Sequence, residues 1–94
     1  MSTPQNTNHN LTLHFKVKDF GAWRQTYNND EKGRSAAGIT NGRVFHGAED
    51  PNDVVILQDV SDESKARTWL GSEAVKTAMQ NGGVIGSPSL RFAA

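Results

Sequence analysis

A strict alternation of apolar and polar residues near the start of the chain constrains the fold more than any other feature of the sequence. From residue 11 to residue 18, apolar side chains stand at every second position and polar ones fill the gaps: Leu11, Leu13, Phe15 and Val17 against Thr12, His14, Lys16 and Lys18. Successive side chains of a β-strand point to opposite faces, so this pattern predicts a strand with one apolar face and one polar face.

A helix is predicted to follow this strand. Asp19 stands where an N-cap residue is expected, and Phe20, Trp23 and Tyr27 recur at helical spacing on one face. We expect this helix to end between Lys32 and Gly38. A second strand is then predicted within residues 39–46, a turn at 47–53 and a third strand over 54–57, where four apolar residues stand in a row. A short turn between two such strands favours a hairpin.

The second helical region contains two apolar stripes that do not line up. Ser61-Asp62-Glu63 begins it with a cap and acidic residues. On one straight helix, the stripe of Ala66, Trp69 and Leu70 would point away from the stripe of Val75, Ala78 and Met79. Gly71-Ser72 lies between them, so we predict a break there that lets each piece turn its stripe inward. Alternation at residues 89–92 predicts the last strand.

The predicted order is βαββαβ. Right-handed crossovers then give a four-stranded antiparallel sheet with two helices on one face, which is the ferredoxin-like α+β class. Residues 1–10 are polar and rich in Asn, and we expect them to form a disordered tail. Residues 11–94 make up the domain.

The helices of such a fold cover only one face of the sheet. The third predicted strand offers apolar residues to both faces, so the uncovered face is partly apolar and favours a partner. Only 35% of the residues are hydrophobic, and there is no Cys to supplement a thin core with disulfides. We therefore predict a homodimer in which two sheets pack face to face and close a barrel-like space, a dimeric α+β barrel.

Composition argues against several other classes of partner. Ten Lys and Arg balance ten Asp and Glu, and the basic stripe of a nucleic-acid-binding protein is missing. No apolar run approaches the roughly 20 residues that span a bilayer, and the first residues do not have the pattern of a signal peptide. We expect no nucleic-acid or membrane partner and a cytoplasmic location. His9, His14 and His46 are scattered, without acidic residues at matching spacing, so no metal site is predicted.

Several segments resemble the dimeric α+β-barrel proteins related to antibiotic-biosynthesis monooxygenases, in particular small bacterial proteins labelled cyclase-like or stress-responsive. The matching segments cover nearly everything after the tail: His14-Phe15-Lys16-Val17-Lys18-Asp19-Phe20 with Trp23, Gly42-Arg43-Val44-Phe45-His46, Asp50-Pro51-Asn52 before Val54-Val55, Ser72-Glu73 with Met79, and Gly83-Val84-Ile85-Gly86-Ser87-Pro88.

The resemblance implies a homodimer with a ligand space between the sheet and its helices. Some members are cofactor-free oxygenases in which an Asn, a Trp and a Tyr or His act on a phenolic substrate, and this trio does not map onto the present chain. Haem-degrading relatives hold the iron with a His on the second helix. Here no His lies between Ser61 and Gln80, which argues against haem degradation. We expect no cofactor.

Five residues are the candidates for a site. By alternation His14 faces the uncovered side, where it can act as a base near neutral pH or form a structural hydrogen bond across the dimer. Lys16 and Arg91 share that side and either hold a carboxylate or enolate or lie in water at the barrel mouth. Trp69 stands just before the helix break, where a cavity could open. His46, at a strand end, either reaches the same cavity or is solvated.

Three functions remain open. The first is a cofactor-free enzyme that oxygenates or cyclises a small aromatic or polyketide-like compound, with His14 as base and Trp69 and Arg91 as positioning groups. The second is a non-catalytic, stress-associated protein that binds a small apolar molecule. The third is a dimeric domain whose cavity is filled by its own side chains.

Overall fold

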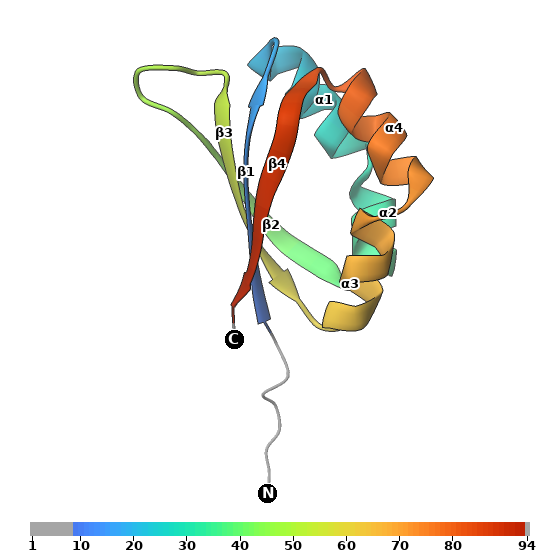
Figure 1. Ribbon diagram of the computed structural model, residues 1–94. Coiled ribbons are helices and arrows are strands. Elements are labelled where there is room, and N and C mark those ends of the chain that lie inside the picture. The colour runs from blue at the N-terminus through green and yellow to red at the C-terminus, as the bar shows by residue number, and fades with distance from the viewer. Residues whose placement is uncertain (1–8, 94) are drawn as a thin grey trace, which may run out of the picture.

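The computed structural model describes residues 9–93, which form one sheet covered by helices on one side (Figure 1). The elements follow in this order: β1 (His9–Val17), α1 (Phe20–Asn29), α2 (Glu31–Ala36), β2 (Ile39–His46), β3 (Asp53–Val60), α3 (Glu63–Leu70), α4 (Glu73–Asn81) and β4 (Val84–Ala93). Each of the two predicted helical regions is thus a pair of shorter helices, as was predicted only for the second region.

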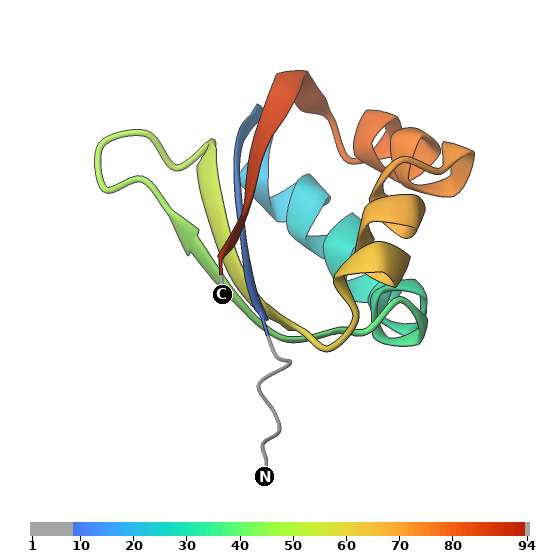
Figure 2. The same ribbon diagram turned by 60° about the horizontal axis from the view of Figure 1, so that its bottom comes forward.

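The four strands are ordered β2-β3-β1-β4, and every neighbouring pair is antiparallel. All the helices lie on the same face, and the opposite face is bare within the described chain (Figure 2). This arrangement confirms the predicted ferredoxin-like α+β fold.

Strand β1 is the centre of the core, as its alternation predicted. Its apolar residues are buried under the helices, while His14 and Lys16 point to the open face. The strand begins at His9, two residues earlier than predicted, because His9 and Asn10 pair with Val60 and Asp59 of β3. The expectation that residues 9 and 10 belong to a disordered tail is therefore wrong, and residues 1–8 of that predicted tail lie outside the described residues.

The break in the second helical region is confirmed. Leu70 ends α3, and the Ser72 side chain caps α4 by accepting a hydrogen bond from the backbone N–H of Val75. The first helical region was predicted to be continuous, and here the structure differs. It breaks at Asp30, after the poor helix formers Asn28 and Asn29, and α2 turns off as a separate helix.

One side chain ties the β2–β3 turn to the start of the helical layer. The Asn52 Oδ1 atom accepts a hydrogen bond from the backbone N–H of Phe20 at 3.0 Å, and Asn52 Nδ2 donates to the Lys18 carbonyl at 3.3 Å. The Asn52 carbonyl accepts from the Val17 N–H at 2.9 Å. The turn therefore fixes where β1 ends and α1 begins. Within residues 9–93, no helix combines the length and the hydrophobicity needed to cross a bilayer.

Candidate functional site

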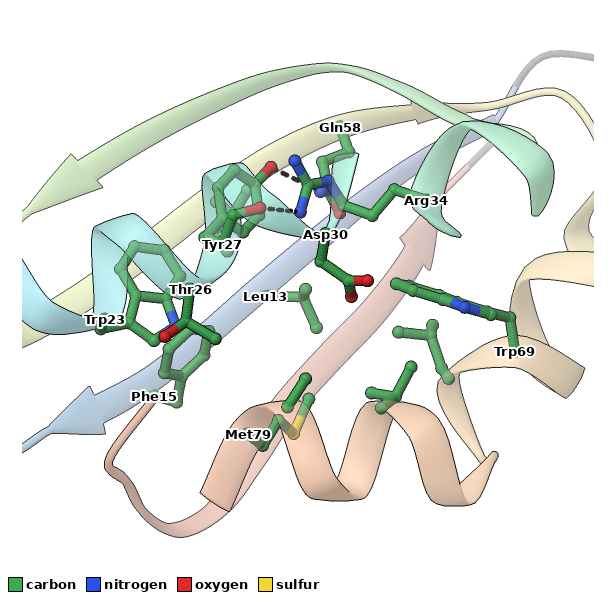
Figure 3. Close-up of a pocket in the computed structure, with 14 residues that line it drawn as sticks. Leu13, Phe15, Trp23, Thr26, Tyr27, Asp30, Arg34, Gln58, Trp69 and Met79 are labelled. Carbon is green, nitrogen blue, oxygen red and sulfur yellow. Dashed lines mark hydrogen bonds between the residues drawn. The ribbon is translucent and has the colours of Figure 1, made fainter. Parts of the chain in front are cut away.

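An apolar cavity lies between the inner face of the sheet and the helices, and its volume is about 70 Å³. Leu13, Phe15 and Ile56 form its floor, and residues of α1, α3 and α4 form its walls, with Trp23, Trp69 and Met79 prominent among them (Figure 3). Trp69, Leu70 and Met79 are only half-buried, so the cavity lies at the margin of the core.

The wall contributed by α1 is a stack of aromatic rings. The rings of Trp23 and Tyr27 are stacked, with centroids 5.1 Å apart and planes inclined by 28°, and Phe15 meets Trp23 edge-on at 5.4 Å. The Arg34 guanidinium lies 3.6 Å from the centroid of the Tyr27 ring. Offset stacking and cation–π contact are both favourable geometries for such rings, so Tyr27 is clamped on both faces.

A polar residue interrupts this apolar lining from below. Gln58 of β3 is 2% exposed, and its Nε2 donates a hydrogen bond to the Tyr27 hydroxyl at 2.8 Å. Its Oε1 is buried and has no hydrogen-bond partner among the described residues. A buried acceptor without a partner destabilises a fold by about 1–3 kcal/mol, so its presence in the cavity wall requires an explanation.

Gly42 leaves room for the Tyr27 hydroxyl. Strand β2 bulges between Thr40 and Arg43, where Asn41 adopts a left-handed φ of 55°. A Cβ atom on Gly42 would lie 2.3 Å from the Tyr27 Oη. The bulge therefore brings the bare backbone of β2 against Tyr27.

The mouth of the cavity is formed where α2 and α3 meet. The indole of Trp69 packs against Gly33, where an added Cβ would lie 3.3 Å from the Trp69 ring and 3.0 Å from the Asp30 Oδ1. The Asp30 carboxylate does not cap α2, and Figure 3 shows it directed across the mouth toward Trp69. Ser72 Oγ donates to the Trp69 carbonyl at 2.6 Å, so the helix break also positions Trp69.

A second, polar pocket of about 290 Å³ shares Tyr27, Arg34 and Gln58 with the apolar cavity. Its remaining lining comes mainly from α1, α2 and the β2 bulge, including Arg24, Asn28, Thr40 and Asn41. The hydrogen-bonded pair of Tyr27 and Gln58 is thus common to both spaces.

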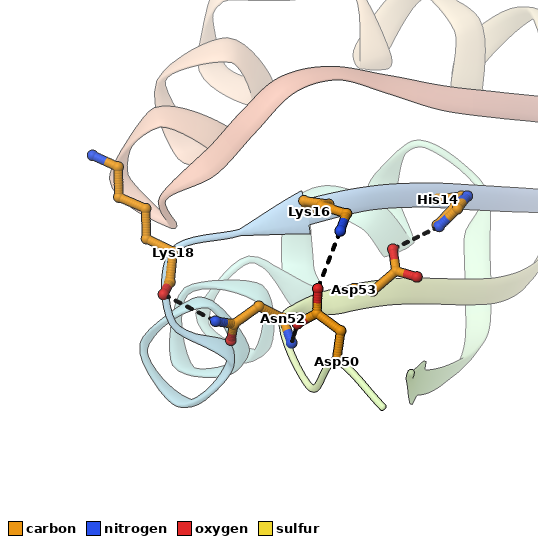
Figure 4. Close-up of polar contacts among 6 residues, drawn as sticks. All are labelled: His14, Lys16, Lys18, Asp50, Asn52 and Asp53. Carbon is orange, nitrogen blue, oxygen red and sulfur yellow. Dashed lines mark hydrogen bonds and ion pairs between the residues drawn. The ribbon is translucent and has the colours of Figure 1, made fainter. Parts of the chain in front are cut away.

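Three of the five predicted site residues lie on the open face of the sheet, as predicted. His14 and Lys16 alternate with the buried residues of β1, and Arg91 pairs with Thr12 in register, which places it on the same face. His14 Nε2 lies 2.7 Å from the Asp53 Oδ1, and Lys16 Nζ donates a hydrogen bond to the Asp50 Oδ2 at 3.1 Å. Both contacts are drawn in Figure 4. The hydrogen bond between Lys16 and Asp50 raises the pKa of Lys16 and lowers the pKa of Asp50.

The other two predicted residues lie elsewhere. His46 is exposed at the end of β2, where its ring meets that of Phe20 edge-on at 4.9 Å, and it does not line the apolar cavity. Trp69 does line the cavity, but from the helical side. The idea that His14 and Arg91 act together with Trp69 on one ligand must therefore be corrected, because the sheet separates them.

The residues that sequence reasoning missed are Asp30, Arg34 and Gln58. Gln58 could have been found from the sequence, since it alternates in step with Val54, Ile56 and Val60, whose side chains all face the core. Asp30 and Arg34 gave no such signal, because their positions depend on the break between α1 and α2. Within residues 9–93, no three His, Cys, Asp or Glu side chains gather closely enough to hold a metal ion.

Comparison with known proteins finds likeness in structure and none in sequence. No protein-family model matches the chain, and no curated protein matches it. A protein from Nitrosomonas europaea, provisionally described as an antibiotic biosynthesis monooxygenase, is 13% identical, with a TM-score of 0.72 over 99% of this chain and 94% of that chain. A similarly described protein from Bordetella bronchiseptica is 8% identical, with a TM-score of 0.78 over 95% and 97% of the two chains.

SnoaB, a cofactor-independent oxygenase from Streptomyces nogalater, is 11% identical, with a TM-score of 0.71 over 94% of each chain. Identities this low establish the fold and leave function to be argued from the site. The chain therefore has the α+β fold of the antibiotic-biosynthesis-monooxygenase-like proteins.

Proposed function

We propose that this protein is a small-molecule enzyme that oxygenates a small aromatic compound, without a cofactor, in the cavity between sheet and helices. The observation that carries the proposal is an apolar cavity with two Trp side chains and one partnerless polar atom in its wall, in a fold shared with SnoaB. Cavities of this kind, apolar with a few polar groups, are the usual sites for small ligands.

The volume of the cavity limits the substrate. At about 70 Å³ it is smaller than the cavity of about 150 Å³ that takes up benzene in another protein. Movement of flexible side chains such as Met79 can admit one ring. A single-ring compound therefore fits better than the polyketide-like molecule that the sequence suggested.

The chemistry needs a proton acceptor and molecular oxygen. In such a reaction an activated CH₂ group becomes C=O, and the second oxygen atom leaves as water with both hydrogens. The substrate thus supplies all four electrons. Asp30 is the carboxylate of the cavity mouth and is our candidate for the proton acceptor, in place of His14. Trp69 would hold the ring.

We further propose that the protein is a cytoplasmic homodimer that pairs through the open face of its sheet. The paired charges of His14 with Asp53 and Lys16 with Asp50 would then lie at the interface. His14 acts in this view as a structural residue of the dimer.

Oxygen uptake tests the enzymatic proposal. We expect the wild type to consume O₂ with at least one compound from a panel of single-ring phenols and their reduced derivatives, with the rate unchanged by EDTA. Trp69→Ala should lower the rate at least about tenfold. His46→Ala is the control, because His46 lies outside the cavity, and its rate should stay within about twofold.

The alternatives give different results. Ligands that raise the melting temperature without any O₂ uptake would favour a non-catalytic binding or stress-responsive protein. If no member of the panel binds or reacts, the cavity is only a gap in the packing of a structural domain.

A further inference from the structure

Gln58 stands out as a buried polar group that the fold itself does not need. It lies in the inward phase of β3, between Ile56 and Val60, whose side chains are 1% and 0% exposed. An apolar residue there would continue the core without burying an unpaired carbonyl oxygen, although the Tyr27 hydroxyl would lose the hydrogen bond from Nε2. Gln58 instead lines a mostly apolar cavity, and its carbonyl oxygen is buried there without a hydrogen-bond partner among the described residues.

The amide of Gln58 is also held in one orientation. Its Nε2 donates to the Tyr27 hydroxyl, and the Tyr27 ring is fixed between Trp23 and Arg34. Gly42 closes the space beyond that hydroxyl. Because its nitrogen is engaged in this way, Oε1 is left as the free acceptor of the wall.

We propose that Gln58 determines the specificity of the cavity by accepting a hydrogen bond from a hydroxyl or N–H group of a single-ring ligand. This inference rests on the proposed ligand site and adds the feature that its ligand must carry. A ligand without a donor would keep Oε1 unpaired, and sites built around a buried polar group reject such analogues more strongly than apolar pockets reject a missing methylene.

Phenol and toluene form a matched pair of probes, because a hydroxyl group replaces a methyl group of similar size. Toluene is the more hydrophobic of the two and would bind better to a purely apolar cavity. We expect the wild type to bind phenol at least about tenfold more tightly than toluene when both are titrated by NMR into the full-length protein. The Gln58→Leu variant should lose this preference and bind toluene at least as tightly as phenol.

Two further variants sharpen the test. Gln80→Leu makes the same substitution at an exposed position of α4 that does not line the cavity, and it should keep the wild-type preference. If Gln58→Leu does not fold, Gln58→Met replaces the amide with an unbranched side chain of similar length, and it should likewise lose the preference for phenol.

The outcomes separate this inference from the proposed site. Equal binding of the two probes by the wild type, or a tenfold preference that survives in the Gln58 variants, would overturn the role of Gln58 and leave the cavity as a ligand site. Binding of neither probe would overturn the proposed ligand site, and the specificity role would fall with it.

Discussion

At the scale of single residues, the hydrogen bond between Tyr27 and Gln58 depends on Gly42, whose lack of a side chain leaves room for the Tyr27 hydroxyl. A Cβ at residue 42 would lie 2.3 Å from the Tyr27 Oη, closer than non-bonded atoms can approach. A free side chain would move aside, but Tyr27 is clamped between Trp23 and Arg34 and bonded to Gln58. The strand or the ring must shift, and either movement disturbs the amide of Gln58.

We therefore predict that Gly42→Ala lowers the free energy of unfolding by about 1–3 kcal/mol, the usual penalty for an inserted methyl group in a packed site. Urea denaturation measures it. Gly21→Ala is the matched control, since a Cβ there meets only the Asp19 Oδ2 at 3.5 Å and the residue lies in α1. It should raise stability by about 0.5–1 kcal/mol, the difference in helix propensity. Equal effects of the two substitutions would mean that Tyr27 is not fixed.

At the scale of elements, α3 is tied to the central strand β1 and to the edge strand β4 through Glu63 and Arg67. Glu63 Oε2 accepts a hydrogen bond from Arg67 Nε at 2.6 Å, and Glu63 Oε1 lies 2.9 Å from His9 Nδ1 of β1. The Arg67 guanidinium lies 4.3 Å from the ring centroid of Phe92 on β4. The hydrogen bond from Arg67, ahead of the contact with His9, lowers the pKa of Glu63 below its ordinary value of 4.5.

The lowered pKa of Glu63 determines how the stability of the fold changes with pH. A carboxyl group with a lowered pKa in the folded state stabilises the fold above its unfolded pKa, and this contribution disappears as the pH falls through the folded value. We predict that Arg67→Met is less stable than the wild type at pH 6 and that the difference narrows as the pH falls below 4.5.

Urea denaturation across this range measures the difference. Lys76→Met is the control, because the Lys76–Glu73 pair is 3.7 Å apart and largely exposed, so its difference from the wild type should stay small at every pH. If the free energies of unfolding of Arg67→Met and the wild type differ by the same amount at every pH, Arg67 acts only by packing on Phe92.

Of the two helix breaks, only one could be predicted from the sequence alone. The break before Ser72 was predictable because two apolar stripes on one straight helix cannot both face the core. The break at Asp30 was not, since the packing of Trp69 against Gly33 joins residues far apart in the chain. Alternation placed His14 correctly on the open face. Its assignment to one site with Trp69 failed because the space between two sheets was taken for the ligand cavity.

At the scale of the whole molecule, the open face of the sheet carries an apolar band that the described chain leaves uncovered. Phe45 pairs with Val55 across β2 and β3, and Leu57 pairs with Thr12 of β1. Phe45 and Ile85 are 52% and 51% exposed. His14 and Lys16 already pair with Asp53 and Asp50. Arg43 and Arg91 lie on the same face, beside Leu57 and Thr12, so a second copy that covers this band must leave them at its margin or offer them acidic partners. A face that pairs with its own copy gives a closed, two-fold symmetric dimer.

We predict that the wild type sediments at twice the 10.2 kDa mass of the chain and that Leu57→Lys shifts it toward the monomer, because the new ammonium group would lie on the open face, between Arg43 and Thr12, and add a like charge to the proposed interface. Leu90→Lys is the matched control. Leu90 is 44% exposed, but it pairs with Leu13 and so belongs to the helical face, and this variant should remain a dimer.

Sedimentation at micromolar concentration separates the two outcomes. A wild-type monomer, or a Leu57→Lys dimer as tight as the wild type, would show that the bare face is not the interface. His14 would then be a solvated side chain paired with Asp53.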